Sequence, residues 1–134
     1  MKKIILFLLV FVFAFSLVGC GGDVSNAKID YGNSRKYSKK EIASAIDTIK
    51  DEFKKEWSGC TLTKIYYAGD DISAQYQDWA DRNNADEVIV LLSSFDVDSS
   101  GGDGSLNPNG TYDNWNWILV RSGNGKWKHV DHGY

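Results

Sequence analysis

The run from Glu87 to Asp96 constrains the fold of this chain more than any other feature. From Val88 to Leu92 its side chains are apolar at both odd and even positions, and Phe95 extends the pattern. Successive side chains of a strand point to opposite faces of a sheet, so a strand of this kind is buried on both faces. The run therefore predicts a central strand in its sheet.

A long helix is predicted ahead of this strand. Ser38-Lys-Lys-Glu41 forms a capping box, in which the Ser38 hydroxyl and the Glu41 carboxylate satisfy free amides at a helix start. Apolar residues then recur at helical spacing, and Gly59 lies where a left-handed residue ends many helices. The apolar positions are Ile42, Ile46, Ile49, Phe53 and Trp57. We assign this stripe to the core of the domain.

The other elements predict an α+β fold. Thr61 to Tyr67 is rich in β-forming residues, and a second, shorter helix is expected from Asp70 to near Asn84. Tyr112 to Arg121 and Lys126 to His132 are predicted strands, joined at Asn124-Gly125 by a tight hairpin. We expect a bent antiparallel sheet of about four strands, packed on one long and one short helix.

The hairpin also suggests which side chains share a face. With a two-residue turn, one face carries Trp115, Trp117, Leu119, Arg121, Lys128, Val130 and His132, and the other carries Asn116, Ile118, Val120, Trp127, His129 and Asp131. His129 and Asp131 are then candidates for a base and the acid that orients it. The alternative is that His129 and His132 are ordinary surface residues of a terminal strand.

The N-terminus has the pattern of an export signal. Lys2 and Lys3 precede an apolar run, Ile4 to Val18, which is short for a membrane span and fits a secretory signal. The run ends in Leu17-Val-Gly-Cys20, which resembles the lipobox of bacterial lipoproteins. This resemblance implies a signal peptide over residues 1–19, lipid attachment at Cys20, and a location on the extracytoplasmic face of the cell membrane. The alternative is an ordinary signal sequence with an incidental cysteine.

The remaining chain divides into two parts. Residues 20–37 hold the lipidated Cys20 and a polar stretch that we expect to be a flexible tether, and residues 38–134 have the size of a single domain. With Cys20 lipidated, Cys60 has no disulfide partner. We therefore expect Cys60 to act as a small apolar residue at the start of a strand. Without Lys2 and Lys3, 13 basic residues face 18 acidic ones, which argues against nucleic acid or an anionic lipid surface as a partner.

Four stretches carry a family resemblance: Gly59 to Thr63, Ser93 to Asn109, Trp117 to Arg121, and Gly125 to Lys128. On these, residues 37–134 resemble an uncharacterised domain of small lipoproteins from Gram-positive bacteria. The element order and the closing hairpin are also similar to nuclear transport factor 2-like half barrels, with another cystatin-like roll as the alternative. Neither resemblance implies an activity, because the first family has none assigned and the second fold hosts many.

The loop after the central strand raises the question of a metal. Asp96-Val-Asp-Ser-Ser-Gly101 matches the first half of a calcium loop, but Asp103 and Asn107 occupy positions that need an apolar residue and a glutamate. A helix-loop-helix calcium site is therefore excluded. An irregular calcium site made of Asp96, Asp98, Ser100 and Asp103 stays open, beside a wide turn that forms the rim of a ligand site.

Aromatic residues point to binding or to core packing. Trp115, Trp117 and Trp127 lie on one hairpin, and we expect at least one of them at an accessible surface. The function that we predict is non-catalytic binding of a small molecule or protein partner, with no cofactor. The alternatives are a small pocket enzyme of the isomerase or hydratase type and a calcium-binding module.

Overall fold

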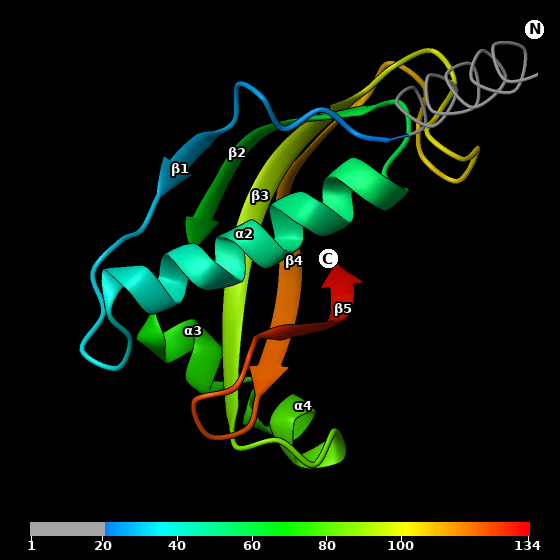
Figure 1. Ribbon diagram of the computed structural model, residues 1–134. Helices are drawn as coiled ribbons and strands as arrows, with labels where there is room; N and C mark the ends of the chain where they lie inside the picture. Colours follow the sequence, from blue (N-terminus) through cyan, green and yellow to red (C-terminus); the bar gives the residue numbers. More distant parts are fainter. Residues whose placement is uncertain (1–20) are drawn as a thin grey trace, which may run out of the picture.

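A computed structural model describes residues 21–134, and the predicted signal peptide and Cys20 lie outside these residues (Figure 1). The chain forms an α+β fold in which a five-stranded open sheet carries one longer helix and two short ones. In chain order the elements are β1 (Lys28–Asp30), α2 (Lys39–Glu56), β2 (Cys60–Tyr67), α3 (Asp70–Ala74), α4 (Gln77–Arg82), β3 (Glu87–Val97), β4 (Thr111–Arg121) and β5 (Lys128–Gly133). Within residues 21–134, no helix combines the length and the apolar character that a membrane crossing requires.

The sheet follows the order of the sequence, with β3 in its centre. This confirms the prediction from the run at Glu87 to Asp96. Strands β2 to β5 pair antiparallel, but β1 runs parallel to β2, so the sheet is mixed and the expectation of a wholly antiparallel sheet was wrong. The parallel pair follows from the connection, because α2 carries the chain across the sheet between β1 and β2 (Figure 1).

Helix α2 begins as predicted. The Ser38 hydroxyl accepts a hydrogen bond from the Glu41 amide, and the Glu41 carboxylate accepts one from the Ser38 amide. The helix ends at Glu56, with Trp57 as its C-cap, and Gly59 follows with a left-handed φ of 76°. Most of the predicted apolar stripe is buried, whereas Trp57 stays partly exposed at the helix end.

Both faces of the sheet are covered. The larger core lies between the sheet and α2 and includes Phe53, Phe95 and Trp117. The smaller core lies on the opposite face, where Ala80 of α4 packs with Val88 and Ile118. The apolar positions on both faces of β3 are explained by these two cores.

The segment that we expected to be a flexible tether is packed on the domain. Residues 28–30 form β1, and Tyr37 is buried and donates a hydrogen bond to the Val88 carbonyl, with an O···O distance of 3.0 Å. The physical reason is a short alternation: Ala27, Ile29 and Tyr31 all pack against the larger core. Their polar neighbours hide this pattern in the sequence.

The second predicted helix is split into α3 and α4. The break lies at Gln75 and Tyr76, where Tyr76 leaves the helical region with φ −107° and ψ 16°. On one side of it, Ser73 is buried and its hydroxyl accepts a hydrogen bond from the Val90 amide. On the other side, Ala80 packs into the smaller core. Because of the break, Ser73 of α3 and Ala80 of α4 can both contact the sheet.

Candidate functional site

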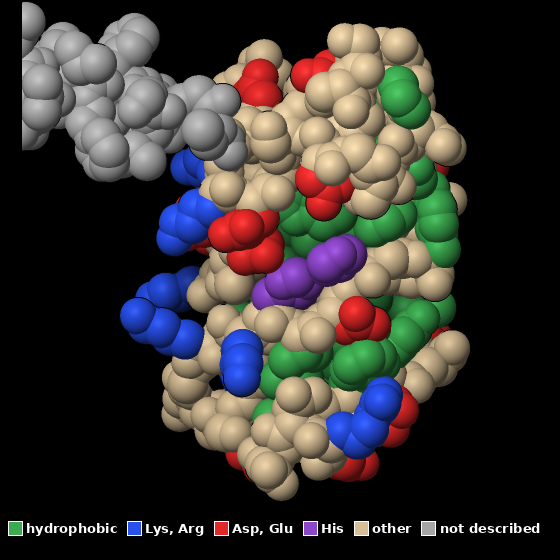
Figure 2. Space-filling model, turned by 90° about the vertical axis from the view of Figure 1, so that its right-hand side faces the viewer, with side chains coloured by type: hydrophobic (Ala, Val, Ile, Leu, Met, Phe, Trp, Pro, Cys, Tyr) green, Lys and Arg blue, Asp and Glu red, His purple; other side chains and the backbone are tan. Residues whose placement is uncertain are grey.

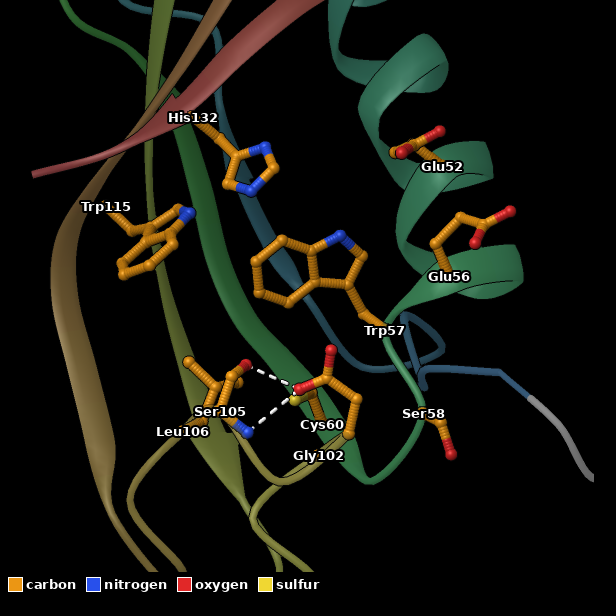
Figure 3. Close-up of a pocket in the computed structure, with 11 residues that line it drawn as sticks. Glu52, Glu56, Trp57, Ser58, Cys60, Gly102, Ser105, Leu106, Trp115 and His132 are labelled. Atoms are coloured by element: carbon orange, nitrogen blue, oxygen red, sulfur yellow. Dashed lines mark hydrogen bonds between the residues drawn. The ribbon is translucent and has the colours of Figure 1, made fainter.

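An open cleft of about 340 Å³ lies at the C-terminal end of α2. Its helix side consists of Glu52, Glu56, Trp57 and Ser58. Its sheet side consists of Cys60, Trp115 and His132, and its outer wall is the loop segment at Gly102, Asp103, Ser105 and Leu106 (Figure 3). We call this site the aromatic cleft.

Tryptophan and histidine rings form the inside of the aromatic cleft. Trp57 and Trp115 meet edge to face, with ring centroids 5.8 Å apart and an interplanar angle of 82°. His132 lies 5.1 Å from Trp57 and 6.0 Å from Trp115, again between centroids. Figure 3 shows the three rings converging from three different elements. The Nε1 atom of Trp115 is buried and has no hydrogen-bond partner among the described residues.

Carboxylates surround the rings. Glu52 and Glu56 lie on the helix side and Asp103 on the loop side, and none of the described lining residues is a lysine or an arginine. Figure 2 shows the histidines beside a strip of hydrophobic side chains that is flanked by acidic ones. Burial raises the pKa of the Cys60 thiol, and the loop carboxylates Asp98 and Asp103 raise it further. Cys60 is therefore a neutral, buried residue that begins β2, as predicted.

The two histidines lie together, in contrast to the predicted faces. His129 pairs with Leu119 and His132 with Trp117, whereas Asp131 pairs with Ile118 on the opposite face. The connection between the strands runs from Ser122 to Trp127 and a bulge interrupts the pairing, so the two-residue turn that set the predicted faces was wrong. The proposed pairing of His129 with Asp131 on one face is thereby corrected.

His129 has other neighbours than expected. Its Nε2 lies 3.2 Å from Nδ1 of His132, and its Nδ1 lies 3.8 Å from a carboxylate oxygen of Glu52. Burial lowers the pKa of His129, and His132 lowers it further, while Glu52 acts in the opposite direction. At neutral pH the imidazole is thus uncharged, and its contact with Glu52 is not an ion pair.

Of the three tryptophans proposed for binding, Trp115 lines the cleft. Trp117 is fully buried and donates a hydrogen bond to Ser93 Oγ. Trp127 is also buried, with its indole N–H bonded to the Glu41 carbonyl and the Arg121 guanidinium over its ring. Trp57 was assigned to the core stripe and missed as a site residue. The signal in the sequence was its position as the last apolar residue of the stripe, two residues before Gly59.

The loop of residues 98–110 walls the cleft and holds its carboxylates in local turns. Asp98 accepts hydrogen bonds from the amide and hydroxyl of Ser100, and Asp103 accepts the same pair from Ser105. Asp96 accepts a hydrogen bond from the Thr111 hydroxyl. Across residues 21–134, no three His, Cys, Asp or Glu side chains form a group suited to a metal ion. The candidate ligands Asp96, Asp98, Ser100 and Asp103 are thus engaged with their neighbours.

The described chain starts at the same end of the domain as the aromatic cleft. The Gly22 amide donates a hydrogen bond to the Phe53 carbonyl near the end of α2, and Asp23 pairs with Thr61 next to Cys60. In Figure 1 the start of the blue segment, the end of α2 and the loop after β3 lie side by side. Gly22, two residues after the proposed lipid attachment point, is therefore held at this end of the domain.

Together, fold and site define a small α+β domain with one aromatic, acidic cleft at the end of its long helix. Comparisons of the chain with protein-family models, curated proteins and solved structures give no match.

Proposed function

We propose that this chain is a lipid-anchored protein of the extracytoplasmic face of the cell membrane, and that its domain binds a ligand or partner without catalysing a reaction. The observation that carries the binding proposal is the aromatic cleft, where Trp57, Trp115 and His132 leave ring surface open beside polar groups. Small-molecule sites have this combination of apolar rings and a few polar groups.

The anchor is supported by the N-terminal pattern, which runs from two lysines through an apolar segment to Leu17-Val-Gly-Cys20. A diacylated cysteine supplies two acyl chains, enough for stable membrane attachment. Because Gly22 is bonded to the end of α2, a lipid on Cys20 holds the cleft next to the membrane surface. The ligand would then be met at or near the headgroup layer.

We propose in addition that β2 to β5, wrapped on α2, form a half barrel of the nuclear transport factor 2-like type. In support, the four strands follow one another in an antiparallel meander, and one long helix covers one face. A cystatin-like roll is the alternative. In either arrangement the end of the helix and the open side of the sheet provide the place for a pocket.

The two alternative functions have less support. A pocket enzyme based on His129 and Asp131 loses its acid–base pair, because these residues lie on opposite faces of β5. A calcium module needs converging oxygens, and the loop carboxylates are each bonded within their own surroundings. Titration of calcium into the full chain tests the second alternative, and a calorimetric binding signal at millimolar calcium would revive it.

The binding proposal is tested with the full lipidated chain, purified from membranes in a non-ionic detergent. A small-fragment screen is followed by NMR of isotope-labelled indole N–H groups, assigned with single Trp→Phe variants. We expect fragments to shift the signals of Trp57 and Trp115 and to leave Trp79, which lies in the other core, unchanged. A screen without shifts at Trp57 and Trp115 would contradict the proposal.

The anchor is tested separately by metabolic labelling with radioactive palmitate. We expect label on the wild-type protein and none on Cys20→Ser, which should also lose its membrane association. Equal partitioning of both proteins into the membrane fraction would refute lipid attachment at this residue.

A further inference from the structure

We propose that the aromatic cleft recognises an organic ammonium cation, either a quaternary ammonium group or a protonated amine. This inference rests on the proposed function of the cleft as a ligand site and specifies the chemical class of the ligand. The group could belong to a soluble amine or to a lipid headgroup, because both present the same charged end.

The first argument is the geometry of the rings. Trp57 and Trp115 stand at 82° to each other with centroids 5.8 Å apart, so their ring planes form a corner. One side of Trp57 is occupied by Phe53, which is stacked on it at 5.6 Å and 5°. Phe95 and Trp117 also contact Trp57 edge to face, and the part of the ring that stays exposed lines the cleft. The negative faces of aromatic rings attract cations, with tryptophan the most effective.

The second argument is the charge of the lining. Glu52, Glu56 and Asp103 border the cleft, and no lysine or arginine among the described residues lines it. Asp103 is held ionised, since hydrogen bonds from Ser105 lower its pKa. In the part of the chain that the structure describes, no ion pair involves Glu56 or Asp103, so their charges are uncompensated within the protein. Such a site favours a cation and repels phosphate and carboxylate ligands.

The third argument concerns the basic groups and the size of the cleft. Among the described lining residues the basic side chain is His132, and burial together with His132 lowers the pKa of the neighbouring His129. The volume of about 340 Å³ is at the small end of ligand sites, which fits a compact ammonium group better than an extended peptide.

The test is a titration of the full lipidated chain in a non-ionic, amine-free detergent at constant ionic strength. The probes are choline, ethanolamine, and the neutral isostere of choline in which a tert-butyl group replaces the trimethylammonium group. We expect choline or ethanolamine to shift the Trp57 and Trp115 indole signals, and the isostere to bind at least about tenfold more weakly.

Matched variants separate local charge from overall charge. Glu56→Gln and Asp51→Asn each remove one negative charge from α2, but Asp51 lies outside the cleft and Glu56 lines it. We expect Glu56→Gln to weaken ammonium binding several-fold and Asp51→Asn to leave it almost unchanged. Trp57→Leu should weaken it about tenfold or more, with retention of fold checked by the Trp79 and Trp117 signals.

The outcomes distinguish this inference from the proposed function. If the isostere binds as tightly as choline, or if Glu56→Gln and Asp51→Asn behave alike, the cleft is a ligand site without ammonium selectivity and the inference is overturned. If none of the probes and no fragment of the screen shifts Trp57 and Trp115, both proposals fall.

A second arm identifies the source of the cation. The full chain is reconstituted in vesicles of phosphatidylglycerol alone or with added phosphatidylethanolamine. Shifted Trp57 and Trp115 signals in the mixed vesicles, with a loss of the response to choline, indicate the lipid headgroup. An unchanged choline response in both vesicles indicates a soluble amine.

Discussion

The indole N–H of Trp117 donates a hydrogen bond of 2.7 Å to the hydroxyl of Ser93, and both residues are fully buried in the middle of the sheet. This bond is a buried side-chain link between β3 and β4 on the face that α2 covers. A buried indole N–H that loses its acceptor has no water to replace it.

We therefore predict that Ser93→Ala lowers the free energy of unfolding by about 1–3 kcal/mol, measured by urea denaturation. Trp117→Phe removes the donor, so Ser93→Ala should cost less in that background than in the wild type. Equal costs in the two backgrounds would show that the hydrogen bond is not responsible.

Arg121 joins three parts of the fold. Its guanidinium pairs with Glu87 at 2.6 Å and with Glu41, and lies 4.3 Å from the centre of the Trp127 ring. Its side chain is 10% exposed, so Arg121→Met leaves two partly buried carboxylates without a counter-charge. We predict a loss of about 2 kcal/mol in the free energy of unfolding.

The control is Arg82→Met, which breaks an exposed pair with Asp78 in which the arginine side chain is 58% exposed. Exposed pairs contribute about 0–1 kcal/mol. An equal loss in the free energy of unfolding for both variants would show that the partial burial of Arg121 does not strengthen its ion pairs.

Gly59 combines a left-handed backbone with close neighbours. Its φ is 76°, and a Cβ atom would lie 2.6 Å from Ser100 Oγ and 2.8 Å from an Asp98 carboxylate oxygen. Gly104 has a φ of 98° with open space around it. We predict that Gly59→Ala lowers the free energy of unfolding by about 1 kcal/mol more than Gly104→Ala does, in thermal or urea denaturation. Asp98→Ala should reduce that difference, and a difference unaffected by Asp98→Ala would contradict the steric explanation.

The partly buried His129 gives the domain a pH dependence. Its pKa in the folded state is lowered from 6.5, first by burial and then by His132, with Glu52 and Asp131 opposing. The unfolded chain thus binds more protons than the folded one below about pH 6.5, and the free energy of unfolding falls as the pH decreases through this range. We predict that the free energy of unfolding of His129→Gln changes less steeply between about pH 7 and pH 5 than that of the wild type.

Asp70 does not interfere with this measurement. Hydrogen bonds from Ser34 and Tyr67 lower its pKa to about 2, so its contribution is lost only in more acidic solution. An identical slope in both proteins would exclude His129 as the cause.

Part of the fold was predictable because some elements depend on neighbouring residues alone. The capping box at Ser38 and Glu41 and the burial of Ile42 to Phe53 follow from helical spacing. The hairpin faces were not predictable, because the longer connection reverses the faces of Lys128 and His129, and the bulge that follows returns Asp131 and His132 to their predicted faces. Likewise, β1 is too short for its alternating pattern to stand out from the polar residues around it. Its stability comes from pairing with β2 in the folded sheet.

The sequence by itself determined the central position of β3, the start of α2, the acidic character of the domain and the lipobox-like pattern before Cys20. These features depend on composition and on periodicity within one element. Only the tertiary structure decided that Trp57, Trp115 and His132 share a cleft, that the two histidines touch, and that the segment at Gly22 lies at the same end of the domain. Such contacts join residues far apart in the chain, and they depend on strand register and on the angle at which a helix crosses its sheet.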